Sequence, residues 1–337
     1  MQTISFVIPC YASEHSVALV MEEIRSVVAQ RPEYDYEIVA VNDFSPDGVM
    51  DVLREQAARD TRVKAIDLAK NGGRHNALIC GCHYVTGDYI VFVDDDLQCP
   101  TDRLWELLAP LESGNYDVCF AKYPHKQQSA FKNFGSLMNN AAANWLLGKD
   151  KELRFSNFSV MRRFVKDEVI RYTNPYPYLA GLMLRATGRV TNVVMEERVR
   201  TIGTGHYNFR RSFALWMNSF TAFSVKPLRL STFCGLLSAV LGLLVALYTV
   251  IHKLMVPNVA AGWSSIMAAI LFLGGMILFE QGLTGEYIGR IYISLNNSPQ
   301  FVVREALNVD PRGGPEQPGE SALSCASCAE GCPSDHA

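Results

Sequence analysis

The N-terminal part of the chain alternates short apolar runs with longer amphipathic segments. The apolar runs are rich in Val, Ile and aromatic residues, which is typical of strands buried in a parallel sheet. They lie at residues 3–9, 36–41, 63–68 and 89–94. Apolar residues at helical spacing predict helices at residues 16–30 and 50–60, and residues 71–76 are expected to open another helix. This order predicts an α/β domain with a mostly parallel, Rossmann-like sheet.

The pattern is less regular after residue 100, where we expect a helix followed by a strand at 116–121, and a further strand at 193–199. Residues 130–147 and 207–224 mix aromatic with polar side chains. Such segments suit helices that lie at a membrane interface. Ordinary core helices would carry a similar pattern, so that alternative stays open.

Two later segments, 231–251 and 263–279, contain no charged residue. Each is long enough to cross a hydrocarbon core of about 30 Å at roughly 1.5 Å rise per residue. The short connector predicts a transmembrane hairpin. Basic residues flank both spans, whereas the connector has only Lys253. The positive-inside rule therefore places both ends of the hairpin in the cytoplasm.

We divide the chain into four parts on this basis. We expect residues 1–225 to form a cytoplasmic α/β domain, 226–290 the hairpin with spans at about 231–251 and 263–283, and 291–309 a cytoplasmic segment. Residues 310–337 are rich in Pro, Gly, Ser and Glu, which predicts disorder. Whether the cysteines of this tail, Cys325, Cys328 and Cys332, bind zinc is left open.

Charge and cysteine content narrow the classes of function. The 31 basic and 34 acidic residues nearly balance, so nothing in the charge favours a nucleic-acid partner. Five of the nine cysteines fall in predicted core elements, where cysteine acts as a small apolar side chain. The chain opens on a strand without a signal peptide, so we expect the catalytic part in a reducing cytoplasm.

Candidate chemistry gathers where the strand at 89–94 ends. Asp94, Asp95 and Asp96 follow one another, and Gln98 comes two residues later. Ligands of such sheets bind at the carboxyl ends of the strands, and oxygen ligands suit a hard divalent cation that can hold a diphosphate. An acidic turn without function would look similar. No GxGxxG follows the first strand, which argues against a dinucleotide cofactor.

Four segments, in this order and spacing, resemble the motifs of family 2 glycosyltransferases with a GT-A fold. They are Ile8-Pro9-Cys10-Tyr11, Val41-Asn42-Asp43-Phe44-Ser45, Asn71-Gly72-Gly73-Arg74-His75-Asn76-Ala77 and Asp94-Asp95-Asp96-Leu97-Gln98. The most similar branch is that of the polyprenyl-phosphate glycosyltransferases. It includes dolichyl-phosphate mannose synthase and the bacterial enzymes that act on undecaprenyl phosphate. Gly285-Glu286-Tyr287-Ile288-Gly289-Arg290 is similar to a segment of the bacterial enzymes.

The resemblance implies roles for residues on the donor side. A nucleotide-sugar pocket would be formed by Pro9, Tyr11, Glu14, Asp43, Asp94 and Asp95. Mg²⁺ or Mn²⁺ would be held by Asp94, Asp96 and Gln98. Two structural alternatives stay open, namely that Asp43 forms an Asx-turn and that Gly72 and Gly73 only open a helix.

The resemblance also implies an acceptor side. Lys132, Ser136 and Arg200 would lie near the acceptor phosphate, and the catalytic set would comprise Asp96, Asn157, Arg200 and His206. Relatives commonly carry Asp in place of Asn157 and Lys in place of His206. An amide cannot serve as a base, but a phosphate monoester has a second pKa of about 6 and needs orientation more than deprotonation.

The implied function is inverting transfer of a sugar from a nucleotide-diphosphate sugar, with UDP favoured, to undecaprenyl phosphate. The product would be a lipid-phosphate-linked sugar for the cell envelope. The enzyme would be a multi-pass protein of the inner membrane with a cytoplasmic catalytic domain, and it would be compatible with a homo-oligomer. Two alternatives remain, a glycosyltransferase for another lipid or glycan and a catalytically inactive membrane partner subunit.

Overall fold

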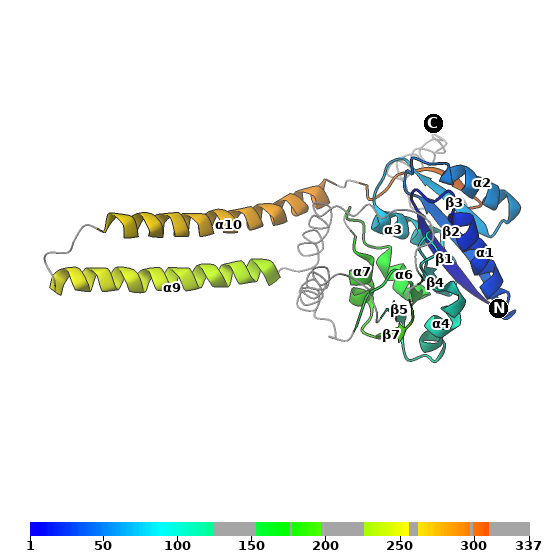
Figure 1. Ribbon diagram of the computed structural model, residues 1–337, viewed down its shortest axis with the longest axis horizontal. Helices are drawn as coiled ribbons and strands as arrows, with labels where there is room; N and C mark the ends of the chain where they lie inside the picture. Colours follow the sequence, from blue (N-terminus) through cyan, green and yellow to red (C-terminus); the bar gives the residue numbers. More distant parts are fainter. Residues whose placement is uncertain are drawn as a thin grey trace, which may run out of the picture.

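The structure is a computed structural model that describes residues 1–123, 153–175, 177–196, 198, 226–255, 262–296 and 299–309. Within these ranges an α/β domain carries two long helices that lie side by side and extend away from it (Figure 1). The segments expected at a membrane interface, 130–147 and 207–224, and the cysteine-containing tail lie outside the described residues.

The described strands form one eight-stranded sheet. Its order is β7 (Val190–Val194), β5 (Val118–Lys122), β6 (Ser159–Arg162), β4 (Tyr89–Phe92), β1 (Gln2–Cys10), β2 (Tyr34–Asn42), β3 (Val63–Leu68) and β8 (Val303–Leu307). Strand β1 is parallel to β2 and β4, β2 to β3, and β5 to β7. Antiparallel pairs join β6 to β4 and β5, and β8 to β3. The mostly parallel sheet predicted from the sequence is confirmed.

Helices cover both faces of the sheet (Figure 1). They are α1 (Val17–Val28), α2 (Val49–Arg59), α3 (Arg74–Tyr84), the 3₁₀ turn η1 (Thr101–Arg103), α4 (Leu104–Glu112), α6 (Arg163–Val169) and α7 (Leu179–Ala186). The strand expected at 193–199 is wrong in its placement, because β7 pairs with β5 from Val190 and ends at Val194. Met195, the next apolar residue, lies outside the ladder.

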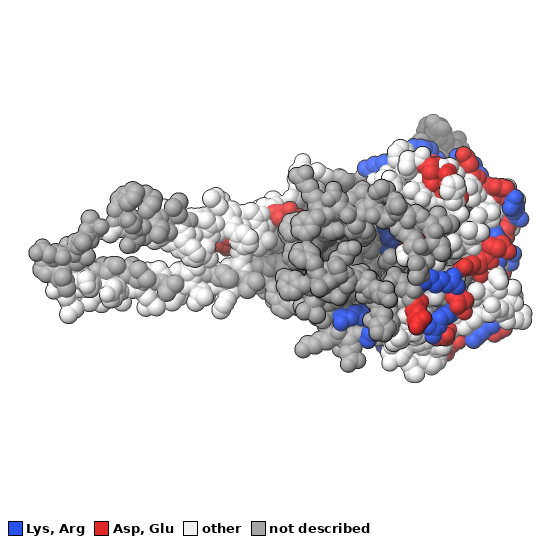
Figure 2. Space-filling model, viewed as in Figure 1, with Lys and Arg blue, Asp and Glu red and all other residues white. Residues whose placement is uncertain are grey.

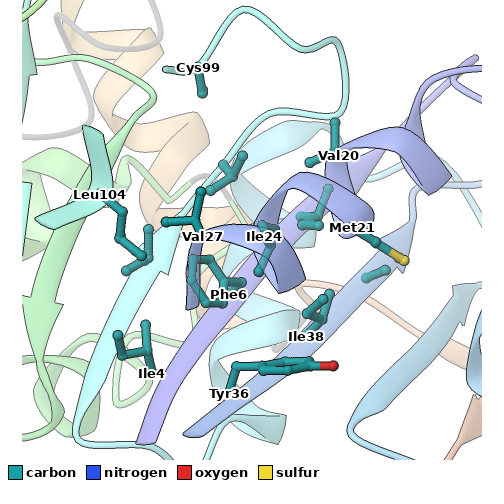
Figure 3. Close-up of a cluster of buried hydrophobic side chains, with 14 of the residues drawn as sticks. Ile4, Phe6, Val20, Met21, Ile24, Val27, Tyr36, Ile38, Cys99 and Leu104 are labelled. Carbon is teal, nitrogen blue, oxygen red and sulfur yellow. The ribbon is translucent and has the colours of Figure 1, made fainter. Parts of the chain in front are cut away.

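The buried core has one layer on each face of the sheet, which explains why the strands are apolar without alternation. Ile4, Phe6 and Ile8 of β1 belong to one layer and Val7 to the other. Figure 3 shows Val20, Ile24 and Val27 of α1 directed toward β1 and β2 in the first layer. The five cysteines of the α/β domain are buried and free, as the sequence predicted; they are Cys10, Cys80, Cys82, Cys99 and Cys119.

The two long helices are α9 (Lys226–Met255) and α10 (Trp263–Leu295). Large apolar side chains stand exposed along both, among them Leu236, Leu244 and Phe279 at 57–73% exposure. Within the part of the chain that the structure describes, no helix meets the length and apolarity required to cross a membrane. The transmembrane hairpin predicted from the sequence is therefore not confirmed.

The chain returns to the α/β domain after α10. Strand β8 pairs antiparallel with β3 and closes that edge of the sheet. Arg54 of α2 forms an ion pair with Glu305 of β8 at 2.7 Å. Just before β8, the Gln300 side-chain amide donates to the carbonyl of Asn174 at 2.8 Å. The segment after α10 is thus an integral part of the catalytic sheet.

Candidate active site

The candidate site lies where β1, β2 and β4 end at the same edge of the sheet, and the loops after these strands are strained. Ala12, Phe44 and Leu97 have φ angles of 55°, 52° and 63°. Among the described residues, only Asn308 is another non-glycine residue with positive φ. Left-handed backbone is unfavourable for bulky residues, and such strain concentrates at functional sites. The three loops are therefore held in an unusual shape together.

Hydrogen bonds connect the loop after β1 to the loop after β4. The backbone N–H of Tyr11 donates to the Asp95 carboxylate at 2.9 Å. Burial raises the pKa of Asp95 to about 6, although the Tyr11 N–H opposes this shift. The Tyr11 ring itself stays 53% exposed at the site. Asp95 thus holds the backbone of Tyr11, while the ring remains accessible to a ligand.

A second set of contacts connects the loop after β1 to the loop after β2. The Ala12 N–H donates to Ser45 Oγ at 2.8 Å, and the Glu14 N–H donates to Asp47 Oδ2 at 3.0 Å. In return, Glu14 Oε2 accepts the N–H of Gly48, directly before α2, at 2.8 Å. The structure thus places Glu14 as a support between two loops. Its predicted contact with a nucleotide stays a prediction.

Asp43 holds the glycine-rich entry to α3. Its two carboxylate oxygens accept the N–H groups of Gly72 at 2.7 Å and Gly73 at 2.9 Å. Burial raises the pKa of Asp43, against the effect of these two donors. The Asx-type contact in this loop belongs to Asn42, whose Oδ1 accepts the N–H of Ser45 at 3.0 Å. Gly72 and Gly73 therefore do more than open a helix, because they cradle a carboxylate.

The Asp94 carboxylate is fixed through both oxygens. Oδ1 accepts from Arg74 Nε at 3.0 Å and from Nη2 at 2.7 Å. Oδ2 accepts from Asn157 Nδ2 at 2.6 Å. The three residues come from the end of β4, the first turn of α3 and the segment before β6. The structure thus brings Asn157 and Asp94 together, as the predicted site requires.

Asp96 and Gln98 continue the loop after β4, and both are half-buried. Asp96 Oδ1 accepts the N–H of Gln98 at 3.1 Å. The described residues contain no group of three His, Cys, Asp or Glu side chains that could hold a metal ion. Mg²⁺ does not require such a group, because it is often bound by one or two carboxylates together with water and substrate phosphates. The oxygen donors of this loop fit that kind of site.

The remaining predicted site residues are placed less directly. Pro9 is buried inside β1 opposite Val41, where it shapes the strand end. The acceptor-side residues lie outside the described residues; they are Lys132, Ser136, Arg200 and His206. Their predicted roles stay predictions.

The sequence-based reasoning gave no role to Arg74, the cation that pairs with Asp94. A signal was available, because a basic residue directly after Gly72-Gly73 at a helix start lies at the ligand-binding edge of the sheet. It also missed the Asn42–Asp67 contact of 2.7 Å, which joins the ends of β2 and β3.

The sequence is similar to known glycosyltransferases along most of its length. The model of glycosyl transferase family 2 matches residues 5–170, and a model described as the GtrB C-terminal hairpin matches residues 226–291. An uncharacterized glycosyltransferase of Bacillus subtilis is 31% identical over 307 residues, covering 91% of this chain and 94% of that protein.

Two further relatives have more specific names. A bactoprenol glucosyl transferase of Shigella flexneri, derived from prophage SfII, is 27% identical and covers 91% of this chain and 99% of its own length. An undecaprenyl-phosphate 4-deoxy-4-formamido-L-arabinose transferase of Pseudomonas fluorescens is 30% identical, with 92% of each chain covered. Among solved structures, glucosyl-3-phosphoglycerate synthase of Mycobacterium tuberculosis with Mn²⁺, UDP-glucose and phosphoglyceric acid is 16% identical. It has a TM-score of 0.49 and covers 67% of this chain and 79% of that one.

The mostly parallel sheet, the carboxylates at its edge and the match to the family model define the class of protein, a glycosyltransferase with a GT-A-like α/β fold. The relative from Bacillus subtilis spans nearly the whole chain at 31% identity. The chain belongs to glycosyl transferase family 2.

Proposed function

We propose that this glycosyltransferase moves a sugar, with inversion, from a nucleotide-diphosphate sugar to a polyprenyl phosphate at the cytoplasmic face of the membrane. UDP is the favoured nucleotide and undecaprenyl phosphate the favoured acceptor. The observation that carries the donor side is the Asp94 carboxylate, fixed by Arg74 and Asn157 at the edge where β1, β2 and β4 end. The names of the relatives from Shigella flexneri and Pseudomonas fluorescens support the acceptor.

The nucleoside lies at the loops after β1 and β2 in this proposal. Tyr11 is exposed there. Asp43 holds the neighbouring loop by accepting the N–H groups of Gly72 and Gly73. Hydrogen bonds among the loops hold their backbone in place, and a loop held in this way loses little freedom when a ligand binds. Pro9, Glu14 and Asp95 support the shape of this pocket, and Asp94 accepts hydrogen bonds from hydroxyl groups of the donor.

The departing diphosphate sets the main electrostatic demand of the reaction. Asp94, Asp96 and Gln98 would hold Mg²⁺ or Mn²⁺, which supplies positive charge to the diphosphate when bound. Arg74 adds a fixed positive charge at the same edge of the sheet, 2.7 Å from Asp94. This cation persists whether or not the metal site is filled.

Asn157 orients reactants in this proposal and does not act as a base. Its amide holds Asp94, and an uncharged side chain does not repel an incoming phosphate dianion. The acceptor phosphate is already a nucleophile near neutral pH, since its second pKa is about 6. Lys132, Ser136, Arg200 and His206 are proposed to bind and orient that phosphate.

We infer that α9 and α10 lie in the inner membrane and bring the site to the lipid acceptor. Support comes from the match of residues 226–291 to a family hairpin, and from the charge-free segments 231–251 and 263–279. Exposed apolar side chains such as Leu236 and Phe279 run along both helices. A large exposed apolar surface of this kind marks a site of contact with a membrane or a protein. The domain division at 225, 290 and 309 belongs to the same proposal, as does assembly into a homo-oligomer.

A transfer assay tests the function. Membranes that contain the chain are incubated with undecaprenyl phosphate and labelled UDP-, GDP- and dTDP-sugars, and the lipid fraction is analysed for a lipid-phosphate-linked sugar. We expect one donor to give a labelled lipid only when both undecaprenyl phosphate and a divalent cation are present. Label in another lipid or glycan would favour the alternative acceptor. Absence of transfer from every donor would favour an inactive partner subunit.

A further inference from the structure

Phe44, in the loop after β2, combines an unfavourable backbone conformation with an exposed aromatic side chain. Its φ angle is 52°, a left-handed conformation that is costly for an aromatic side chain. The residue is 48% exposed, so burial offsets little of this cost. It directly follows Asp43, whose carboxylate cradles the entry to α3. A strained, exposed aromatic residue at a binding edge suggests a ligand-directed role.

Arg304 of β8 covers part of the Phe44 ring. The guanidinium carbon lies 5.4 Å from the ring centroid, within the range of a cation–π contact. The same guanidinium contacts Asp67 Oδ2 at 3.4 Å and the carbonyl of Ala69 at 3.3 Å, at the end of β3. Asp67 is in turn held by Asn42 at 2.7 Å, next to Asp43. Arg304 is thereby fixed to the end of β3 while it faces Phe44.

We propose that Phe44 and Arg304 form a platform for the base of the nucleotide, with Phe44 as the stacking face and Arg304 as its positioning residue. A ring that is about half exposed has surface left for an aromatic ligand beside the guanidinium. Bases stack on such rings without a requirement for a particular base. The strand that follows α10 then contributes directly to donor binding, although it lies more than 250 residues from Phe44 in sequence.

This inference rests on the proposed function, because it requires a nucleotide at the edge formed by β1, β2 and β4. A surface contact without function would also join Arg304 to Phe44. A contact without function does not explain why an exposed Phe44 keeps an unfavourable left-handed backbone conformation. The platform accounts for that conformation, because it presents an aromatic ring next to Asp43 in the sequence and in contact with Arg304.

The test uses the full-length protein in detergent and the nucleoside diphosphate that the wild type binds best among UDP, GDP and dTDP. The variants are Arg304→Ala, Arg304→Lys, Phe44→Leu and Phe44→Trp. The matched control is Arg54→Ala, which removes a different ion pair to the same strand, Arg54–Glu305. Dissociation constants are measured by calorimetry, and inhibition by inorganic pyrophosphate is measured in the transfer assay. Thermal unfolding of each variant shows whether it is folded.

We expect Phe44→Leu and Arg304→Ala to weaken binding of the nucleoside diphosphate by about tenfold. KM for the nucleotide sugar rises by a similar factor, while kcat and inhibition by pyrophosphate stay near the wild-type values. Arg304→Lys and Phe44→Trp retain most of the affinity, and Arg54→Ala retains all of it.

Unchanged affinity in folded Arg304→Ala and Phe44→Leu overturns the platform and leaves the proposed function intact. An equal loss of pyrophosphate inhibition overturns it too, because Arg304 would then act through its charge on the phosphates. An equal loss in Arg54→Ala assigns the effect to attachment of β8, which also overturns the platform. A wild type that binds none of the three diphosphates refutes the proposed function itself.

Discussion

At the scale of single residues, Asp94 shows how hydrogen bonds fix a carboxylate in one orientation at the site. Arg74 holds one oxygen and Asn157 the other, at distances of 2.6–3.0 Å. Charge-assisted hydrogen bonds of this kind are stronger than neutral ones and specify direction. The Asp94 side chain is only 18% exposed, so water weakens the contacts little. A group fixed in this way offers a ligand a defined acceptor without loss of side-chain entropy.

Substitutions of Asn157 give the first prediction for a single residue. Asn157→Ala removes a hydrogen bond at an exposed residue, which costs about 0.5–1.5 kcal/mol of stability. Asn157→Asp also places a second carboxylate next to Asp94, so it should lower the unfolding temperature further in the presence of EDTA. Added Mg²⁺ should recover more stability in Asn157→Asp than in Asn157→Ala, because a cation relieves the repulsion. Thermal unfolding with EDTA and with Mg²⁺ measures both effects, and equal temperatures for the two variants would contradict them.

Asp96 provides the second prediction. We expect Asp96→Ala to lower transfer by about a hundredfold or more, since the charge of the departing diphosphate is then poorly compensated. Binding of Mn²⁺, followed by electron paramagnetic resonance, should weaken in parallel. Glu106→Ala is the control, because Glu106 of α4 forms a surface ion pair with Arg103 of η1 and such pairs contribute little. Full Mn²⁺ binding by Asp96→Ala would remove Asp96 from the metal site.

Helix α3 is the element on which the donor side depends. It begins directly after Gly73, which has a φ of 83°, and its first residue is Arg74. Its interior face lies on β1 and β2, where an added Cβ at Gly81 would meet Val7 Cγ1 at 2.4 Å. The close approach at Gly81 sets how deep α3 lies on the sheet. It therefore also sets where Arg74 meets Asp94.

A glycine substitution tests this dependence. Gly81→Ala should destabilise the protein by about 1–3 kcal/mol, because the core around Val7 has no space for an added methyl group. It should also weaken binding of the nucleoside diphosphate through displacement of Arg74. Gly188→Ala is the matched control, since nothing lies within 4 Å of a Cβ added there. Denaturant unfolding and calorimetry report the two effects, and wild-type behaviour of Gly81→Ala would show that α3 adjusts freely.

At the scale of the whole molecule, charge and apolar surface are separated. On the face shown in Figure 2, the described Lys, Arg, Asp and Glu side chains gather over the α/β domain, and only a few acidic side chains stand on the pair of long helices. The surface of the two long helices consists largely of exposed apolar side chains, such as Leu236, Leu244 and Phe279. The return of the chain into β8 connects the C-terminal end of α10, which lies next to the α/β domain in Figure 1, to the sheet.

Membrane orientation is the prediction at this scale. Lys226 and Arg229 precede the first charge-free segment, and Arg290 and Arg304 follow the second. A reporter fused after residue 310 should therefore behave as cytoplasmic, and one inserted near residue 258 as external. The pairing of β8 with β3 requires the same placement, because both strands belong to one sheet. External labelling at residue 310 would refute the orientation and the access of the site to cytoplasmic nucleotide sugars.

Local patterns in the sequence were sufficient for the N-terminal fold and for the order of the candidate motifs. Apolar runs predicted β1 to β4 to within a few residues, because a strand buried on both faces must be apolar throughout. The rule that strands of a parallel sheet end at one edge was enough to bring Tyr11, Asp43 and Asp94 to the same region. The strand at 193–199 was misplaced, because an apolar run does not state which of its residues find a partner strand.

Tertiary structure alone decided the partners across that edge. Asp94 meets Arg74 and Asn157 because α3 and the segment before β6 converge on the end of β4, at separations of 20 and 63 residues. Arg304 meets Phe44 because β8 pairs with β3 after the long helices. No local periodicity encodes such contacts, since they depend on how separate elements pack together. The sequence by itself therefore determined the elements, the family motifs and the chemical types at the site, and the fold decided which carboxylate is held, by which cation, and which ring is covered.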